Sequence, residues 1–183
     1  KVLEALKTDF TVIGRGPDTA KQCEEATGCK VMIGGLKQFL DMQPEICSHA
    51  IVSVGVEKLY ETTKELLEYG VKNILVEKPA GLHKKEFEDL VQATKEKDSN
   101  VFVAYNRRYY PLLDKMKSLV ANDVCYYINI ISGQYLPQWR PTRDYRKTYS
   151  SKKDGGGVLL DLSHEIDYVK YLCGDMKVLS SIN

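Results

Sequence analysis

Short β-rich runs alternate with amphipathic runs over the first two-thirds of this 183-residue chain. Five runs are apolar, rich in Val or Ile and bounded by turn residues, and we expect them to be strands: 9–14, 30–34, 49–55, 71–79 and 101–107. Four runs between them show helical spacing of apolar residues: 17–28, 36–42, 57–70 and 83–97. Strands joined through helices pair in parallel with right-handed crossovers. The alternation therefore predicts an α/β fold built on a parallel sheet.

The composition excludes several classes of protein. The chain has 26 basic and 25 acidic side chains, a net charge of +1, whereas nucleic-acid binding depends on a surplus of positive charge. No apolar run approaches the roughly 18 residues that a membrane span needs, and the opening residues carry no signal-peptide pattern. Five cysteines without any CxxC and three dispersed histidines argue against a disulfide framework or a metal site. We expect a cytoplasmic protein without a metal, a nucleic-acid partner or a membrane partner.

The pattern changes near residue 122. A long run rich in Tyr and Ile, 123–136, reads as a strand, and a loop rich in Arg and aromatic residues follows at 137–154. Three glycines and a helical run, 155–174, come next. We therefore predict a second, sheet-based domain that begins near residue 123.

The segment Ile13–Ala20 has the strand, Gly-x-Gly and helix order of a dinucleotide-binding turn. The full fingerprint, G-x-G-x-x-G, has a third glycine, and here that position is Thr19. In the alternative interpretation, 9–14 is the second strand of a Rossmann unit, and Gly14 and Arg15 lie at its tip. An Arg there accommodates the 2′-phosphate of NADP, whereas NAD enzymes carry a carboxylate. An ordinary exposed Arg is the equal alternative, so both NAD and NADP stay open.

Three motifs, in order, resemble those of the Gfo/Idh/MocA oxidoreductases, the glucose–fructose oxidoreductase and inositol dehydrogenase family. They are VEKPAG at 76–81, VAYNRRYYP at 103–111 and GGGVLLDLSHEID at 155–167. The resemblance covers nearly the whole chain.

This resemblance implies a Rossmann-type doubly wound domain followed by an α/β domain with a mostly antiparallel open sheet. We assign the dinucleotide-binding domain to residues 1–122 and the substrate and oligomerisation domain to residues 123–183. By comparison with the family, the first Rossmann strand would precede Lys1, and much of the second sheet would follow residue 183. This alignment with the family favours 9–14 as the second strand of the Rossmann domain.

The first motif places Lys78 between Glu77 and Pro79 at the end of a strand, where ligands of open α/β sheets bind. A partly buried ammonium polarises a hydroxyl, and desolvation lowers its pKa. The resemblance implies that Lys78 is catalytic, that Glu77, Lys78 and Pro79 contact the cofactor, and that a cis peptide at Pro79 aims Lys78. The alternative is a surface lysine paired with Glu77.

If the third motif forms one helix, with about 100° of rotation per residue, then Asp161, His164 and Tyr168 share one face. Another face is apolar and would pack against the core: Leu162, Ile166, Val169 and Cys173. His164 would take a hydroxyl proton, because its unperturbed pKa lies near neutrality, and Asp161 would orient the imidazole or hold a second hydroxyl. Many family members space this Asp and His four residues apart, not three. A solvated helix face is the alternative.

Other polar residues complete the predicted site. Asn106, at the end of a strand, is assigned to the cofactor, and Arg108 to the substrate, with a structural ion pair as the equal alternative for Arg108. Trp139, Arg140 and Tyr145 of the loop, with Tyr168, are also assigned to the substrate, because aromatic faces stack on sugars and Arg binds carboxylates or phosphates. RNA binding and a structural covering loop are the competing interpretations of the loop.

These observations predict an NAD(P)-dependent oxidoreductase that acts on a hydroxyl or keto carbon of a sugar or sugar nucleotide. We expect its partners to be the small-molecule substrate and further copies of itself, in a homodimer or homotetramer. A non-catalytic homologue that binds a nucleotide or a partner protein is the alternative. A lyase or glycosidase-like enzyme with tightly held NAD is a third.

Overall fold

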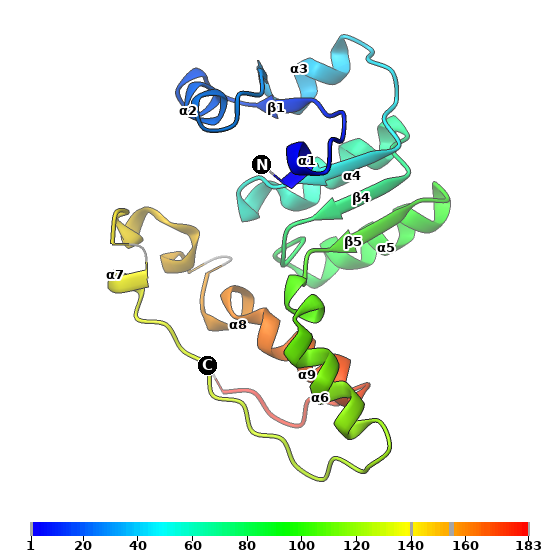
Figure 1. The fold of residues 1–183 in the computed structure, drawn as a ribbon, viewed down its shortest axis with the longest axis vertical. Coiled ribbons are helices and arrows are strands. Elements are labelled where there is room, and N and C mark those ends of the chain that lie inside the picture. The colour runs from blue at the N-terminus through cyan, green and yellow to red at the C-terminus, as the bar shows by residue number, and fades with distance from the viewer. Residues whose placement is uncertain (1, 140, 154–155, 183) are drawn as a thin grey trace. The chain divides into compact units, whose positions relative to one another are not determined.

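The computed structural model describes residues 2–139, 141–153 and 156–182. It contains two compact units, Lys1–Cys47 and Ser48–Asn183, each of which is described by itself (Figure 1). In both units the strands pair in parallel and alternate with helices. The predicted α/β class with parallel strands is confirmed.

The first unit is a two-stranded parallel ribbon with three helices. In chain order its elements are α1 (Val2–Ala5), β1 (Val12–Gly14), α2 (Pro17–Thr27), β2 (Val31–Ile33) and α3 (Gly35–Asp41). Gly14 ends β1 opposite Ile33. A Cβ on Gly14 would lie 2.8 Å from Cγ1 of the buried Val31, so close strand packing accounts for a glycine there.

The second unit is built on the parallel sheet β3-β4-β5. Its first elements are β3 (His49–Val52), a 3₁₀ turn (Val56–Lys58), α4 (Leu59–Tyr69), β4 (Asn73–Val76), α5 (Lys84–Glu96) and β5 (Asn100–Val103). The helix α4 packs on β3 and β4 and beside α5, and it buries residues at helical spacing: Leu59, Thr63, Leu66 and Leu67. It stops at Gly70, whose φ of 111° is the left-handed conformation that a glycine adopts without steric cost.

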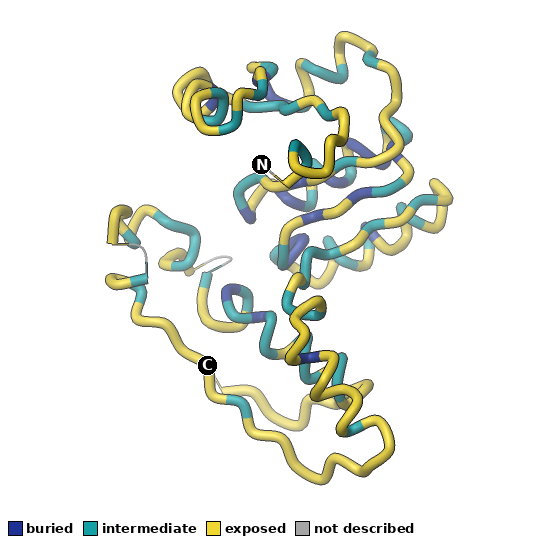
Figure 2. The backbone as a smooth tube through the Cα atoms, in the orientation of Figure 1, coloured by how far each residue is buried: buried dark blue, intermediate teal, exposed yellow. Residues whose placement is uncertain are grey.

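The two faces of this sheet differ in exposure (Figure 2). Ile74 and Val76 of the central strand are fully buried. The opposite face carries Ile51, Leu75 and Phe102, which are aligned by the strand register and are 57%, 40% and 58% exposed. The core of the second unit therefore lies between β4 and the helices on one face.

Beyond β5, the described residues form helices and 3₁₀ turns separated by irregular segments. These elements are a 3₁₀ turn (Asn106–Tyr109), α6 (Pro111–Val120), α7 (Leu136–Trp139), two further 3₁₀ turns (Tyr145–Lys147 and Tyr149–Ser151), α8 (Val158–Asp161) and α9 (Ser163–Cys173). The helices α6 and α9 lie side by side (Figure 1).

The run 123–136, expected as a strand, forms none: residues 123–135 are almost entirely exposed (Figure 2), and Leu136 begins α7. A strand needs a neighbour for its backbone hydrogen bonds, and this run has no ladder partner among the described residues. The antiparallel sheet and the domain boundary near residue 123 stay predictions.

The single helix expected from Asp161 onward is interrupted. Leu162 has φ −107° and ψ 28° between α8 and α9, so a constant rotation per residue does not carry across it. The expected core face is also wrong: Ile166 is 46% exposed and Cys173 is exposed, whereas Asp161 and Ser163 are buried. Apolar spacing predicted the helical run but not the break at Leu162.

The described residues also bear on membrane spans, metal sites and disulfides, which the composition argued against. Within the described ranges, none of the helices combines the length and apolar character needed to cross a lipid bilayer. Over the same ranges, His, Cys, Asp and Glu side chains form no group of three placed to hold a metal ion. All five cysteines are free thiols.

Candidate active site

The turn after β4 presents Lys78 at the carboxyl end of the parallel sheet. Its backbone is held by two hydrogen bonds, from Glu77 N–H to the Val52 carbonyl at 2.9 Å and from Ala80 N–H to the Glu77 carbonyl at 3.0 Å. The Lys78–Pro79 peptide bond is cis, as the family resemblance implies, and Pro79 and Ala80 are buried. The Glu77 side chain is exposed.

The Lys78 ammonium reaches the junction between α8 and α9. Its Nζ donates a hydrogen bond to the main-chain carbonyl of Asp161 and lies 3.4 Å from the carbonyl oxygen of Leu160. Burial lowers the pKa of Lys78, and the nearby carboxylates of Asp161, Glu77 and Glu165 oppose that effect. Lys78 is therefore a half-buried amine that is anchored to backbone carbonyls.

Asp161 ends α8 and is only 6% exposed. Its carboxylate accepts a hydrogen bond from the hydroxyl of Tyr149. Asp161 thus holds Tyr149 with its side chain and Lys78 with its main chain. The role expected from the sequence, in which Asp161 orients the imidazole of His164 or holds a second hydroxyl, stays a prediction.

His164 lies in the first turn of α9. Its ring packs edge-on against Tyr105, with centroids 5.6 Å apart and planes at 84°. Burial lowers the pKa of His164, and the positive charges of Arg107 and Lys78 lower it further. Its buried Nδ1 has no hydrogen-bond partner among the described residues. The imidazole is therefore neutral at neutral pH and has a nitrogen without a protein partner.

Two adjacent arginines fasten α9 to the end of the sheet. Arg107 pairs with Glu165, and Arg108 forms a two-pronged pair with Asp167, with Nε–Oδ2 and Nη2–Oδ1 distances of 2.8 and 2.5 Å. The Asp167 side chain is 8% exposed. For Arg108 the structure thus shows the ion pair that was the alternative, and substrate binding by Arg108 stays a prediction.

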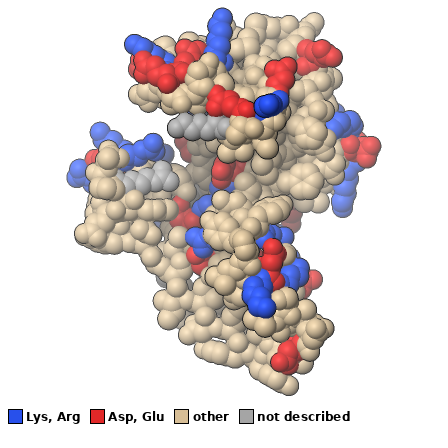
Figure 3. Space-filling model, in the orientation of Figure 1, with Lys and Arg blue, Asp and Glu red and all other residues tan. Residues whose placement is uncertain are grey.

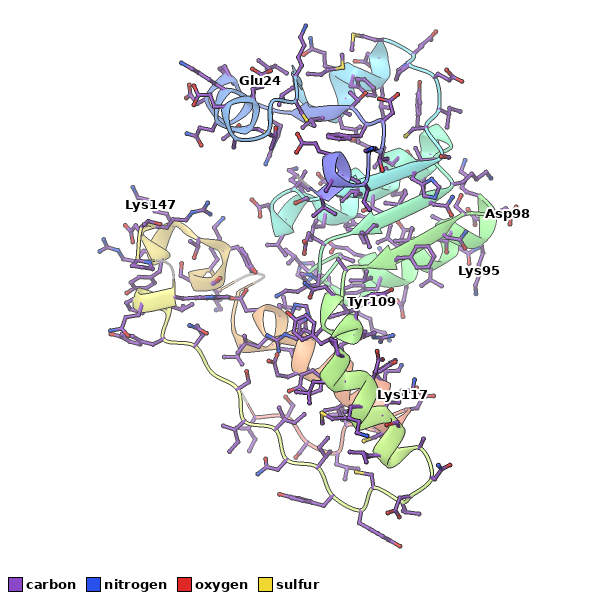
Figure 4. All side chains as sticks on the ribbon, in the orientation of Figure 1. Glu24, Lys95, Asp98, Tyr109, Lys117 and Lys147 are labelled. Carbon is purple, nitrogen blue, oxygen red and sulfur yellow. The ribbon has the colours of Figure 1, made fainter. Side chains whose placement is uncertain are left out.

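The remaining candidates of the second unit lie around this cluster. Asn106 begins the 3₁₀ turn after β5 and is exposed, whereas Tyr168 is half-buried on α9, one turn after His164. Figure 4 labels Tyr109 at the end of the same 3₁₀ turn, and Lys117 on the adjoining helix α6. The assignment of Asn106 to the cofactor and of Tyr168 to the substrate stays a prediction.

The aromatic and Arg-rich loop lines an open pocket of about 490 Å³. Its lining combines aromatic, basic and hydroxyl side chains, including Trp139, Arg143, Tyr145, Lys147 and Tyr149. Basic side chains gather over this segment in Figure 3, and Lys147 is labelled there in Figure 4. The structure therefore brings the predicted substrate residues Trp139 and Tyr145 to one pocket, whereas Arg140 lies outside the described residues.

Gly14 and Arg15 lie in the first unit, at the tip of β1. Arg15 is exposed, and its Cγ lies 3.4 Å from where a Cβ on Gly35 would stand. The guanidinium is thus accessible at the end of a parallel strand, which is the position the NADP interpretation requires. The choice between NAD and NADP stays a prediction.

The comparison with family models decides the family. The model described as "Oxidoreductase family, NAD-binding Rossmann fold", Gfo/Idh/MocA, matches residues 9–105. The chain belongs to the Gfo/Idh/MocA oxidoreductase family. The matched range includes Lys78 and its turn, whereas the GGGVLLDLSHEID motif lies beyond it.

Curated relatives of this Gfo/Idh/MocA chain are oxidoreductases. Myo-inositol 2-dehydrogenase of Thermotoga maritima is 25% identical over 150 residues, which cover 67% of this chain and 42% of the relative. Oxidoreductase P35 of Formosa agariphila is 33% identical over 113 residues, which cover 58% of this chain and 35% of the relative. The chain thus spans less than half the length of these relatives.

Solved structures share the fold. The WlbA dehydrogenase of Bordetella pertussis, in complex with NADH and UDP-GlcNAcA, superposes with a TM-score of 0.73 at 16% identity, over 94% of this chain and 50% of that one. A levoglucosan dehydrogenase in complex with NADH gives a TM-score of 0.71 at 22% identity, over 90% and 44% of the two chains. The Rossmann fold predicted from the sequence is therefore confirmed.

Sequence reasoning missed three residues of the cluster. Arg107 and Glu165 had a usable signal, because two adjacent arginines after a strand and two carboxylates two residues apart on a helix are suited to pairing. Tyr149 had none, since no helical or strand spacing relates it to Asp161, twelve residues further along the chain.

Proposed function

We propose that this chain is part of an NAD(P)-dependent oxidoreductase that transfers hydride between nicotinamide and a hydroxyl or keto carbon of a sugar or sugar nucleotide. The observation that carries the proposal is the meeting of Lys78 and Asp161 at the carboxyl end of the sheet, with His164 in the adjoining turn. Dehydrogenases among the relatives, and WlbA and levoglucosan dehydrogenase in complex with NADH, support it.

The second unit has groups that fit a nicotinamide and a hydroxyl substrate. Ligands of open α/β sheets bind beyond the carboxyl ends of the strands, where the turn Glu77–Gly81 and Asn106 lie. The buried Nδ1 of His164 has no protein partner among the described residues and is suited to accept a proton. The nicotinamide, when bound, supplies or accepts the hydride.

Each residue then has a defined part. Neutral His164 takes the proton of the substrate hydroxyl in the oxidative direction and returns it in the reductive direction. The ammonium of Lys78 stabilises the negative charge that develops on the same oxygen. The loop residues Trp139, Arg140 and Tyr145, with Arg108 and Tyr168, hold the sugar. The same proposal includes a cytoplasmic location and a homodimer or homotetramer.

Dinucleotide titration and two variants test this function in the full-length protein. We expect NADH or NADPH to bind with a fluorescence change, and Lys78→Met and His164→Ala to retain that binding. Their turnover with a panel of sugars, cyclitols and sugar nucleotides should fall by roughly 10²–10⁴-fold, the usual contribution of positioned acid–base groups.

The control variant is Lys84→Met, which removes an exposed lysine at the start of α5. Its turnover should match that of the wild type. Unchanged turnover in Lys78→Met would contradict the catalytic assignment. A full-length protein that binds neither NADH nor NADPH would contradict the oxidoreductase itself and favour the partner-binding homologue.

A further inference from the structure

We infer that Tyr149 is a positioning residue of the proposed active site, which holds Asp161 and, through the Asp161 main chain, Lys78. The inference rests on the proposed function for its catalytic meaning. Its structural content is a chain of two hydrogen bonds, from the Tyr149 hydroxyl to the Asp161 carboxylate and from Lys78 Nζ to the Asp161 carbonyl.

Asp161 couples the position of Tyr149 to that of Lys78, because it is buried and bonds one residue through its side chain and the other through its main chain. A carboxylate that is 6% exposed needs hydrogen bonds to offset the loss of water, and the Tyr149 hydroxyl provides one. The carbonyl of the same residue, at the end of α8, accepts the Lys78 ammonium. A displacement of the side chain therefore moves the acceptor of Lys78.

The backbone around Tyr149 is itself fixed by Gly156. A Cβ on Gly156 would lie 2.3 Å from the Lys152 carbonyl oxygen, 2.6 Å from that of Tyr149 and 2.8 Å from that of Ser150. Only glycine allows this approach. Gly156 thus packs against the 3₁₀ turn Tyr149–Ser151, whose Tyr149 hydroxyl reaches Asp161 at the end of α8.

Tyr149 also lines the loop pocket, with the predicted substrate residues Trp139 and Tyr145. A sugar group bound in that pocket would contact the side chain that holds Asp161. The same tyrosine therefore connects the substrate loop to the Lys78 cluster within the second unit.

The charge environment of Lys78 gives a measurable consequence. The carboxylates of Asp161, Glu77 and Glu165 favour the charged ammonium of Lys78, whereas the positive charge of Arg107 disfavours it. The Lys78 charge in turn lowers the pKa of His164. Without the Tyr149 hydroxyl, the Asp161 carboxylate loses a donor and is held less firmly near the amine. The pKa of Lys78 should then fall further below its usual value.

The test measures Lys78 directly, without relying on turnover. The full-length protein is trace-labelled with acetic anhydride over a pH series, and peptide mass spectrometry gives the labelling of Lys78 relative to the exposed Lys84. In Tyr149→Phe we expect the labelling midpoint of Lys78 to move to lower pH by about half a unit. Gly156→Ala, which displaces the Tyr149 turn, should move it in the same direction.

The matched control is Tyr60→Phe. Tyr60 donates a hydrogen bond to Asp89 of α5, so this variant removes the same kind of tyrosine–aspartate contact at a site remote from Lys78. It should leave the Lys78 midpoint at its wild-type position. Midpoints that coincide in wild type, Tyr149→Phe and Gly156→Ala would overturn the inference.

Turnover provides the second measurement. Tyr149→Phe should lower kcat about tenfold, as expected for losing one hydrogen bond to a charged group, with KM and NAD(P)H affinity nearly unchanged because the ring remains. An unchanged kcat would also overturn the inference. Failure of the wild type to bind a dinucleotide would refute the proposed function alone, because the labelling result does not depend on it.

Discussion

At the scale of single residues, the environment of His164 sets both its chemistry and a pH dependence. Burial, Arg107 and Lys78 all favour the neutral imidazole, so its pKa lies below the value of 6.5 that it has in the unfolded chain. The unfolded state then binds more protons between these two pKa values, and folding stability falls as the pH is lowered through that window. At higher pH the imidazole is neutral in both states, and this destabilising effect is absent.

Replacing His164 should remove that dependence. We expect His164→Gln, which cannot take up the proton, to lose less stability than the wild type when the pH falls from 7 to 5. Urea unfolding at a series of pH values measures the difference in the free energy of unfolding. The two stability curves should converge or cross toward acid pH, and parallel curves would contradict a lowered pKa.

The residue scale also shows how far sequence could define the site. The family resemblance implied that Lys78 is catalytic, whereas the topology of a parallel sheet specified only that its strand end lies at the edge where ligands bind. Asp161 and His164 were placed on one face by a constant helical rotation, which the break at Leu162 interrupts, and the Asp161 carboxylate accepts a hydrogen bond from Tyr149. Spacing along one helix reveals neither the break nor a partner in another element.

At the scale of elements, two arginines of one 3₁₀ turn hold the helix α9. Arg108 closes on Asp167 with two parallel hydrogen bonds, and the Asp167 side chain is 8% exposed while Arg108 is 41% exposed. The aromatic ring of Tyr171 lies 5.4 Å from the Arg108 guanidinium. The helix that carries His164 is thus fastened by contacts that sequence spacing on α9 alone does not show.

A double-mutant cycle on Arg108 and Asp167 should detect this attachment. Arg108→Met leaves a buried carboxylate without its partner and should destabilise the protein by about 2–3 kcal/mol. Asp167→Asn in the same background should recover part of the loss, which gives a coupling free energy of about 1–2 kcal/mol. Chemical denaturation of the four proteins measures it.

The control cycle uses Lys84 and Glu88, an exposed pair on α5 with side chains 89% and 63% exposed. Its coupling should be indistinguishable from zero, since solvent screens such pairs. Equal coupling in the two cycles would mean that the Arg108 pair is no more than a surface contact, and it would reopen the substrate-binding assignment of Arg108.

The elements themselves were predictable where a local rule applies. Each of the five expected strands up to residue 107 overlaps one observed strand, and only β5, which begins at Asn100, extends beyond its expected run. Short apolar runs between helices are typical of the strands of an α/β sheet. The helix α4 ends at Gly70 through its left-handed backbone, a stop that glycine commonly provides. The run 123–135 shows the limit, since β propensity makes a chain extended but does not supply a partner strand.

At the scale of the whole molecule, charge balance limits the partners that the loop 137–154 can attract. The sequence left three interpretations of this loop open: a site for a carboxylated or nucleotide-linked sugar, an RNA-binding segment, and a structural loop that covers the second domain. In the structure, Arg146 pairs with Asp144 at 2.9 and 3.1 Å, so one of the loop's positive charges is already neutralised. The chain's net charge of +1 offers little further attraction for a phosphate backbone.

We therefore expect the full-length protein not to bind nucleic acid. Its dissociation constant for a fluorescein-labelled random-sequence RNA should be weaker than about 10⁻⁴ M at physiological salt, at or beyond the weak end of non-specific binding. Fluorescence anisotropy at several salt concentrations measures this, with Arg143→Ala and Lys147→Ala as matched variants of the pocket lining. Binding that weakens steeply with salt, and weakens again in both variants, would support the RNA interpretation. A small-molecule site should instead lose sugar affinity in these variants while the anisotropy stays at its baseline, because a pocket of about 490 Å³ has room for a sugar but not for a run of nucleotides.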